Sequence, residues 1–166
     1  EQLPTHGGSL RIYGCHANDP RETTKAVSQL LAEEEQKGLQ TLQPYLSFQP
    51  RADKIKDDLL EFLIQQKKNG KSVVAYGAAA KGNTLLNYAG VKPDLLPFVC
   101  DAAAAKQDKY MPGSHIPILA PEAIRQAEPD FVVILPWNIS EEVQLQLKPE
   151  VPGAQFIVVV PELKVS

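Results

Sequence analysis

The stretch Val73-Val74-Ala75-Tyr76-Gly77-Ala78-Ala79-Ala80-Lys81-Gly82-Asn83-Thr84 decides the fold of this chain. A β-branched apolar run stops at a glycine, and a loop of small residues leads into an apolar segment with helical spacing. Such strand–turn–helix connections expose backbone N–H groups, and the positive end of a helix dipole, to a phosphate. Lys81 adds a mobile cation and Asn83 an amide donor. A tight turn with a surface lysine is the alternative explanation.

The loop nearly matches a dinucleotide-binding fingerprint. Gly77-x-Ala79-x-x-Gly82 is G-x-G-x-x-G with its middle glycine replaced by alanine. Asp101 ends the next predicted strand 24 residues after Gly77, close to the roughly 20 expected for a carboxylate that takes a ribose hydroxyl. The pattern indicates a nucleotide, and the alanine weakens the case for a closely packed NAD pyrophosphate.

Composition limits the classes of function. The chain has 166 residues, 43% of them hydrophobic, with a mean hydropathy of −0.21, which is typical of a single globular domain with at most a short appendage. A net charge of −3 and a pI near 5.6 give no footprint for nucleic acid or an anionic membrane. No apolar run approaches about 18 residues. The first residue is Glu1 and no signal peptide follows, so we expect a cytoplasmic fragment of a longer protein.

The spacing of the cysteines and histidines indicates neither a disulfide nor a metal site. Cys15 and Cys100 each lie in or just after an apolar run and are expected to be buried free thiols. None of the three histidines has a ligand partner at metal-site spacing, so no metal site is expected.

The first 70 residues predict a strand and two helices. Leu10 to Cys15 alternates like a strand. Asp19-Pro20 predicts the start of a helix that ends at Gly38, and residues 39–50 are expected to be a connection. A long helix from about Ala52 then closes at Asn69-Gly70.

From residue 71 onward, strands and helices alternate. Strands are predicted at 72–76, 96–100, 130–135 and 155–160, and helices at about 82–90, 120–127 and 140–148. The runs at 131–135 and 156–160 are continuously apolar, as in parallel strands covered on both faces. The predicted fold is a Rossmann-like, doubly wound, mainly parallel α/β sheet with helices on both faces, preceded by two N-terminal helices. Its ligands should bind beyond the carboxyl ends of the strands.

An ordered series of motifs resembles the C-terminal domain of the S-adenosylmethionine-dependent sugar C-methyltransferases. The resemblance runs from about Thr5 to Glu162 and rests on Tyr76 to Asn87, Asp101, Lys106-Gln107, Pro112 to Ile118, Pro129-Asp130 and Trp137-Asn138. Enzymes of this family transfer a methyl group to a carbon of a nucleotide-linked keto-deoxysugar. The family often has glycine where this chain has Asp108.

The resemblance implies a division of labour. The family's zinc-binding module, its glycine-rich S-adenosylmethionine loop and its catalytic histidine–tyrosine motif are absent from these 166 residues. We therefore expect residues 1–18 to resemble the last strand of a methyl-donor domain, 19–70 to form a helical lead-in, and 71–166 to hold the nucleotide-sugar. The chain itself is expected to bind no cofactor and to be inactive alone. S-adenosylmethionine and an upstream methyl-donor domain, in the same or a separate chain, would complete the enzyme.

Each predicted substrate contact has a simpler alternative. Lys81 and Asn83 are expected to hold a pyrophosphate, as of a dTDP-sugar, rather than only face solvent. Asp101 is expected either to bond the nucleoside or to serve turn chemistry.

Four further contacts complete the predicted site. Trp137 could stack on a ring while Asn138 caps the next helix, Lys106 approaches the phosphate or is solvated, and His6 faces a cleft or is mobile. An NAD-type oxidoreductase domain and a non-catalytic nucleotide-binding module remain the alternative functions.

Overall fold

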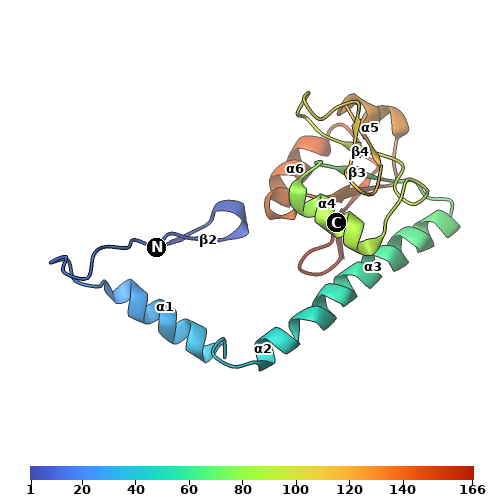
Figure 1. The fold of residues 1–166 in the computed structure, drawn as a ribbon. Helices are drawn as coiled ribbons and strands as arrows, with labels where there is room; N and C mark the ends of the chain where they lie inside the picture. The colour runs from blue at the N-terminus through green and yellow to red at the C-terminus, as the bar shows by residue number, and fades with distance from the viewer. The chain divides into compact units, whose positions relative to one another are not determined.

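Strand β3 (Val73–Tyr76) lies at the centre of a seven-stranded sheet in the computed structural model, which describes residues 1–166 (Figure 1). The strand order is β5-β6-β4-β3-β7-β8-β9. The inner five strands are parallel, and β5 and β9 pair antiparallel at the two edges. The other strands are β4 (Val99–Cys100), β5 (Lys109–Tyr110), β6 (Pro117–Leu119), β7 (Phe131–Ile134), β8 (Gln155–Val158) and β9 (Lys164–Val165).

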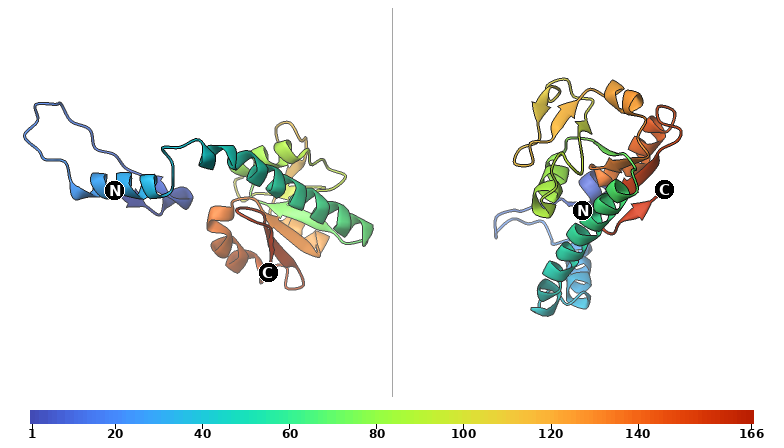
Figure 2. Two further views of the ribbon diagram at one scale, coloured as in Figure 1. Left: turned by 90° about the horizontal axis from the view of Figure 1, so that it is seen from below. Right: turned by 90° about the vertical axis from the view of Figure 1, so that its right-hand side faces the viewer.

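Helices cover both faces of this sheet because its strands are apolar on both sides. Val73 and Ala75 pack in a core with α3 (Phe48–Lys68) and α4 (Ala80–Ala89), and Figure 2 shows α3 lying along the sheet. Val74 and Tyr76 point to the opposite core, formed with α5 (Glu122–Ala127) and α6 (Ser140–Leu147). The prediction of a mixed α/β fold with a mostly parallel sheet is confirmed, and the strand order is compatible with a Rossmann-like fold.

The chain changes direction across the sheet at β3. It runs from β3 outward through β4 to β6 and then returns to β7, which pairs with β3 on its other side. The carboxyl ends of β3 and β7 therefore flank the switch point, where ligands of open α/β sheets bind. The loop after β3 and the 3-10 turn η2 (Trp137–Ile139) after β7 meet there.

The structure forms two compact units, Glu1–Ala52 and Asp53–Ser166. The first contains the hairpin of β1 (Gln2–Leu3) and β2 (Ser9–Leu10), the 3-10 turn η1 (Thr5–Gly7) and the helices α1 (Lys25–Gln36) and α2 (Gln43–Leu46). None of its residues is buried. The second unit contains the whole seven-stranded sheet and its two cores.

The prediction of two N-terminal helices is wrong, because three precede β3. Residues 39–50, expected to be a connection, contain α2 and the start of α3. The connection was predicted because Pro44 and Pro50 were expected to interrupt a helix. A proline is compatible with the first turn of a helix, and Pro44 lies there in α2. The first helix does end before Gly38, whose φ is 72°, but it begins at Lys25. Asp19 instead accepts hydrogen bonds from the backbone and side chain of Arg21.

The predicted strand from Leu10 to Cys15 is also mostly wrong. Only Ser9 and Leu10 pair, with Leu3 and Gln2, and the ladder closes where Arg11 N–H donates to Glu1 O. Cys15 is exposed rather than buried, whereas Cys100 is buried as predicted. Burial raises the pKa of the Cys100 thiol to about 11. No helix is long and apolar enough to cross a bilayer.

Candidate functional site

The turn between β3 and α4 presents the start of a helix at the carboxyl edge of the sheet. Gly77 N–H donates to Cys100 O at 2.7 Å, which fixes the turn against β4. The first i to i−4 bond of the helix runs from Asn83 N–H to Ala79 O at 2.9 Å. The backbone amides of residues 80–82 precede that bond and mark the positive end of the helix dipole. The local geometry therefore suits an anion.

The two glycines of the turn are required by packing. A Cβ on Gly77 would lie 2.5 Å from Pro136 Cδ, and the φ of Gly77 is 87°. A Cβ on Gly82 would lie 2.5 Å from Leu135 Cβ. Ala79 has an ordinary extended backbone, with φ −88° and ψ 150°. The glycines thus bring the turn and α4 against the end of β7, and the alanine costs no backbone strain.

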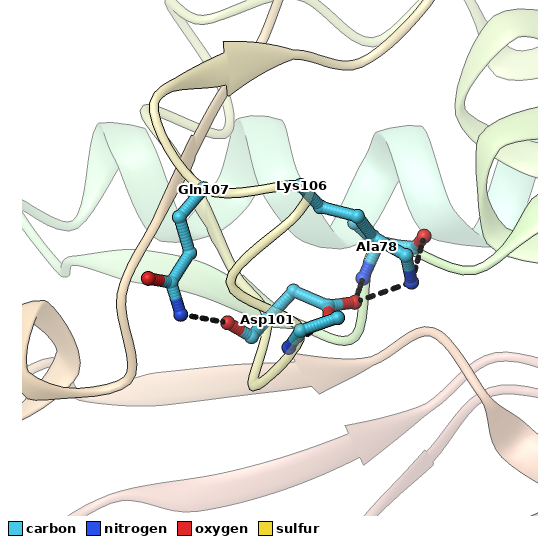
Figure 3. Close-up of polar contacts among 5 residues, drawn as sticks. Ala78, Asp101, Lys106 and Gln107 are labelled. Carbon is cyan, nitrogen blue, oxygen red and sulfur yellow. Dashed lines mark hydrogen bonds and ion pairs between the residues drawn. The ribbon is translucent and has the colours of Figure 1, made fainter.

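Asp101 follows β4 and fastens the turn from the side (Figure 3). Its Oδ2 accepts hydrogen bonds from Ala78 N–H at 2.7 Å and from Lys106 Nζ at 2.9 Å. Its Oδ1 accepts from Ala103 N–H at 2.8 Å, which is the turn chemistry expected of an aspartate. Gln107 donates to the Asp101 carbonyl at 3.0 Å, a contact that sequence reasoning did not identify.

Opposing effects set the pKa of Asp101. Burial alone would raise it, because the residue is only 7% exposed. Hydrogen bonds from Ala103 N–H, the Lys106 ammonium and Ala78 N–H stabilise the charged form, and the net result is a pKa below the ordinary value. The carboxylate is therefore ionised at neutral pH and lies beside a helix N-terminus.

Lys81 and Trp137 meet across the switch point. The Lys81 ammonium lies over the indole ring, 5.4 Å from its centroid. Trp137 is partly buried and packs on the core that contains α3 and α4. An open hollow of about 460 Å³ adjoins the indole, and it is lined by Trp137, Asn138, Ile139, Ser140, Glu141 and Glu142. A ring and a cation thus stand together at the edge where the fold binds its ligands.

Asn83 and Asn138 differ from what their sequence positions suggested. Asn83 Oδ1 is buried and has no hydrogen-bond partner. A buried acceptor without a donor is uncommon and leaves a place for an N–H or O–H group. Asn138 does not cap α6, because Ile139 occupies the N-cap position and no side-chain cap is formed. It lies in η2, on the wall of the hollow.

Most of the predicted site residues belong to this edge of one unit. The turn and α4 contribute Gly77, Ala79, Lys81, Gly82 and Asn83, the loop after β4 contributes Asp101 and Lys106, and the loop after β7 contributes Trp137 and Asn138. His6 lies in the N-terminal unit, in η1, with φ 55°. Whether any of these side chains contacts substrate stays a prediction.

Three other features complete the description of the molecule. A hollow of about 330 Å³ lies at the opposite edge, beside the starts of β7 and β8, and an Arg125–Glu150 ion pair is on its wall. No group of three His, Cys, Asp or Glu side chains is placed to hold a metal ion. Asp108 has φ 60°, the left-handed conformation that favours glycine and that aspartate tolerates.

Comparison with known proteins assigns this architecture to a family. The model of the C-methyltransferase C-terminal domain matches residues 4–161. The chain is also 34% identical over 161 residues to the C-methyltransferase NovU of Streptomyces niveus. That alignment covers 96% of this chain and 38% of the relative, so the chain spans less than two fifths of the relative's length.

Proposed function

The chain belongs to the C-methyltransferase C-terminal domain family, and from that premise we propose that it is the nucleotide-sugar-binding part of an S-adenosylmethionine-dependent C-methyltransferase. The proposed substrate is a dTDP-linked keto-deoxysugar. The methyl donor would bind to a separate upstream domain, in the same or another chain. The two cysteines form no disulfide, which supports a reducing, cytoplasmic location as part of the proposal.

The observation that carries the proposal is the meeting of Lys81 and Trp137 at the start of α4. The helix N-terminus and the Lys81 ammonium provide positive charge for a pyrophosphate. The Trp137 indole offers a face for a base or sugar ring. The buried Asn83 Oδ1 offers an acceptor to a ligand hydroxyl or N–H group. Asn138 lines the adjoining hollow. A substrate contact by His6 stays a prediction from the sequence.

An NAD-type oxidoreductase domain is the main alternative, and the near-fingerprint at 77–82 is its motivation. Two features argue against it. The middle glycine of the fingerprint, which lets the backbone approach a pyrophosphate, is Ala79 in this chain. Asp101, which would take the ribose hydroxyl, accepts three hydrogen bonds from the protein itself. The other alternative, a non-catalytic nucleotide-binding module, would bind the same ligand and would differ only in acting beside a separate methyltransferase chain.

Titration of the purified chain with dTDP, NAD and S-adenosylmethionine tests the proposal. Trp137 is the only tryptophan, so its fluorescence reports on ligands bound at this edge, and calorimetry gives the dissociation constants. We expect dTDP to bind and to change the fluorescence, and the other two ligands to have no measurable effect. Micromolar affinity for S-adenosylmethionine, or binding of NAD in preference to dTDP, would contradict the proposal.

A methyl-transfer assay tests whether this chain needs a separate methyl-donor domain for activity. We expect no turnover by the chain alone, because the donor would not be held against the acceptor carbon. Proximity and orientation can supply about 7–11 kcal/mol of barrier reduction, and both would be missing. Transfer of labelled methyl groups to a dTDP-4-keto-deoxysugar by the isolated chain would overturn this expectation.

A further inference from the structure

Asp101 stands where a dinucleotide-binding fold places the carboxylate that holds a ribose hydroxyl. It follows β4, the strand beside β3, at the carboxyl edge of the sheet. Its two oxygens already accept hydrogen bonds from Ala78 N–H, Ala103 N–H and Lys106 Nζ. A carboxylate has about four acceptor positions, and this residue is 7% exposed. The side chain is therefore committed to the protein's own loops.

The same contacts hold the Ala78 peptide groups at both ends. Ala78 N–H donates to Asp101 Oδ2, and the Ala78 carbonyl accepts from Lys106 Nζ at 3.1 Å (Figure 3). Asp101 and Lys106 are also bonded to each other. Together the two side chains close a ring of three hydrogen bonds around Ala78, the residue that links β3 to the first turn of α4. The ring thus ties the loop after β4 to the turn that precedes α4.

The ion pair with Lys106 also neutralises the negative charge of Asp101 near the start of α4. A lone carboxylate beside the start of α4 would repel a phosphate, although the helix dipole favours an anion there. The ammonium of Lys106 neutralises it at 2.9 Å. Lys106 uses two of its three donor hydrogens in the ring, and its side chain is 45% exposed, so its third N–H is available at the rim.

We propose that Asp101 and Lys106 are positioning residues that fix the turn between β3 and α4, and that the nucleotide site is consequently indifferent to a ribose 2′-hydroxyl. The indifference to the 2′-hydroxyl rests on the proposed function, because it assumes that a nucleotide binds at this edge. A 2′-deoxyribonucleotide has no 2′-hydroxyl to donate to a carboxylate, so an inward-facing Asp101 loses no such contact to it. A ribonucleotide gains none either, because three hydrogen bonds hold the nearly buried Asp101 carboxylate against the protein's own loops.

Amide hydrogen exchange of the ligand-free chain tests the positioning role. We expect the Ala78 N–H to exchange at least tenfold faster in Asp101→Ala, and to a smaller extent in Lys106→Met, with partial restoration in Lys106→Arg. The Val133 amide in the central strand β7 should keep its protection, which excludes general unfolding. Lys67→Met is the matched control, since Lys67 pairs with Asp94 away from this turn. Unchanged Ala78 exchange in Asp101→Ala and Lys106→Met would overturn the role.

Calorimetry with two nucleotides tests the selectivity. The ligands are dTDP and its ribose counterpart, 5-methyluridine diphosphate, which differ only in the 2′-hydroxyl. We expect dissociation constants within threefold of each other, and Asp101→Asn should weaken both ligands by the same factor. A difference of tenfold or more in either direction, abolished by Asp101→Asn, would overturn the inference. Absence of binding by both nucleotides would overturn the proposed function and the selectivity with it, while amide exchange still decides the positioning role.

Discussion

Gly77 and Pro136 approach each other so closely that the chain has no room for a side chain at position 77. A Cβ on Gly77 would lie 2.5 Å from Pro136 Cδ and 2.8 Å from its Cγ. The proline ring is rigid and follows a buried strand, so it cannot rotate away as a flexible side chain would. The contact joins the carboxyl ends of β3 and β7.

Gly77→Ala should therefore destabilise the fold. The φ of 87° disfavours any Cβ, and the clash adds to that strain, so we expect a loss of about 2–3 kcal/mol in the free energy of unfolding. Gly153→Ala is the control, because a Cβ there meets nothing within 4 Å, and its change should stay within about 0.5 kcal/mol. Denaturant titration of both variants measures the difference. Equal stabilities would show that the turn relaxes freely.

Local sequence signals account for the central sheet but not for its edges. The sequence identifies β3, β7 and β8 because a strand that is buried on both faces consists of a continuous run of apolar residues. The glycine turn marks the end of β3. Strands β5, β6 and β9 have two or three residues each. Their pairing is decided by neighbours that are distant in sequence, and no short pattern encodes it. These three short strands, the two edge strands β5 and β9 and the inner strand β6, were accordingly not predicted.

The candidate site shows the same limit. Lys81 and Trp137 could be placed at one edge because the carboxyl ends of parallel strands converge. The turn chemistry of Asp101 was one of two predicted alternatives, but its bonds to Lys106 and Ala78 could not be foreseen, because they depend on residues 101–106 turning back toward Ala78. Spacing alone gives an aspartate at the end of a strand, and only the folded loop decides what its oxygens accept.

Replacement of Lys81 should separate a phosphate contact from a surface residue. If Lys81 binds the pyrophosphate, Lys81→Ala removes a charge-assisted contact of about 1.5–3 kcal/mol and weakens dTDP binding roughly ten- to hundred-fold. The affinity for thymidine, which lacks phosphates, should fall much less in the same variant. Lys67→Ala, at a surface ion pair with Asp94, is the control. Calorimetry that finds equal dTDP affinity in Lys81→Ala and the parent chain would assign Lys81 to the surface.

Asp130 should give the fold an acid-sensitive contact at the opposite edge of the sheet. Its oxygens accept from Lys71 Nζ and from the backbone and side chain of Ser72. These bonds, that from Lys71 first, lower the pKa of Asp130 to about 2 from an ordinary value of 3.8. A carboxyl with a depressed pKa in the folded state stabilises the fold above its unfolded-state pKa, and that contribution is lost as the pH falls from about 4 to about 2.

Asp130→Asn should therefore have a lower melting temperature than the parent chain at pH 7. The gap should narrow between pH 4 and pH 2, where the parent aspartate becomes protonated. Asp57→Asn, on the exposed surface of α3, is a suitable control because Asp57 pairs only with Lys56 there. Thermal melts at a series of pH values make the comparison. A gap that persists unchanged at pH 2 would show that the ionised form of Asp130 contributes nothing to stability.

Binding of the sugar part of the substrate should require a second domain. Most of the residues predicted to bind substrate gather at one edge of the sheet, and the hollow beside Trp137 is open. The matched relative is also much longer, since the alignment covers 38% of it. Ligand pockets usually enclose about 70–90% of a ligand's surface. We therefore expect dTDP and a dTDP-4-keto-deoxysugar to bind this chain with similar, modest affinity, because the sugar would project toward a partner domain. Calorimetry of both ligands on one preparation makes the comparison. A preference of a hundred-fold or more for the sugar conjugate, about 2.7 kcal/mol, would mean that these 166 residues already contain a complete sugar pocket.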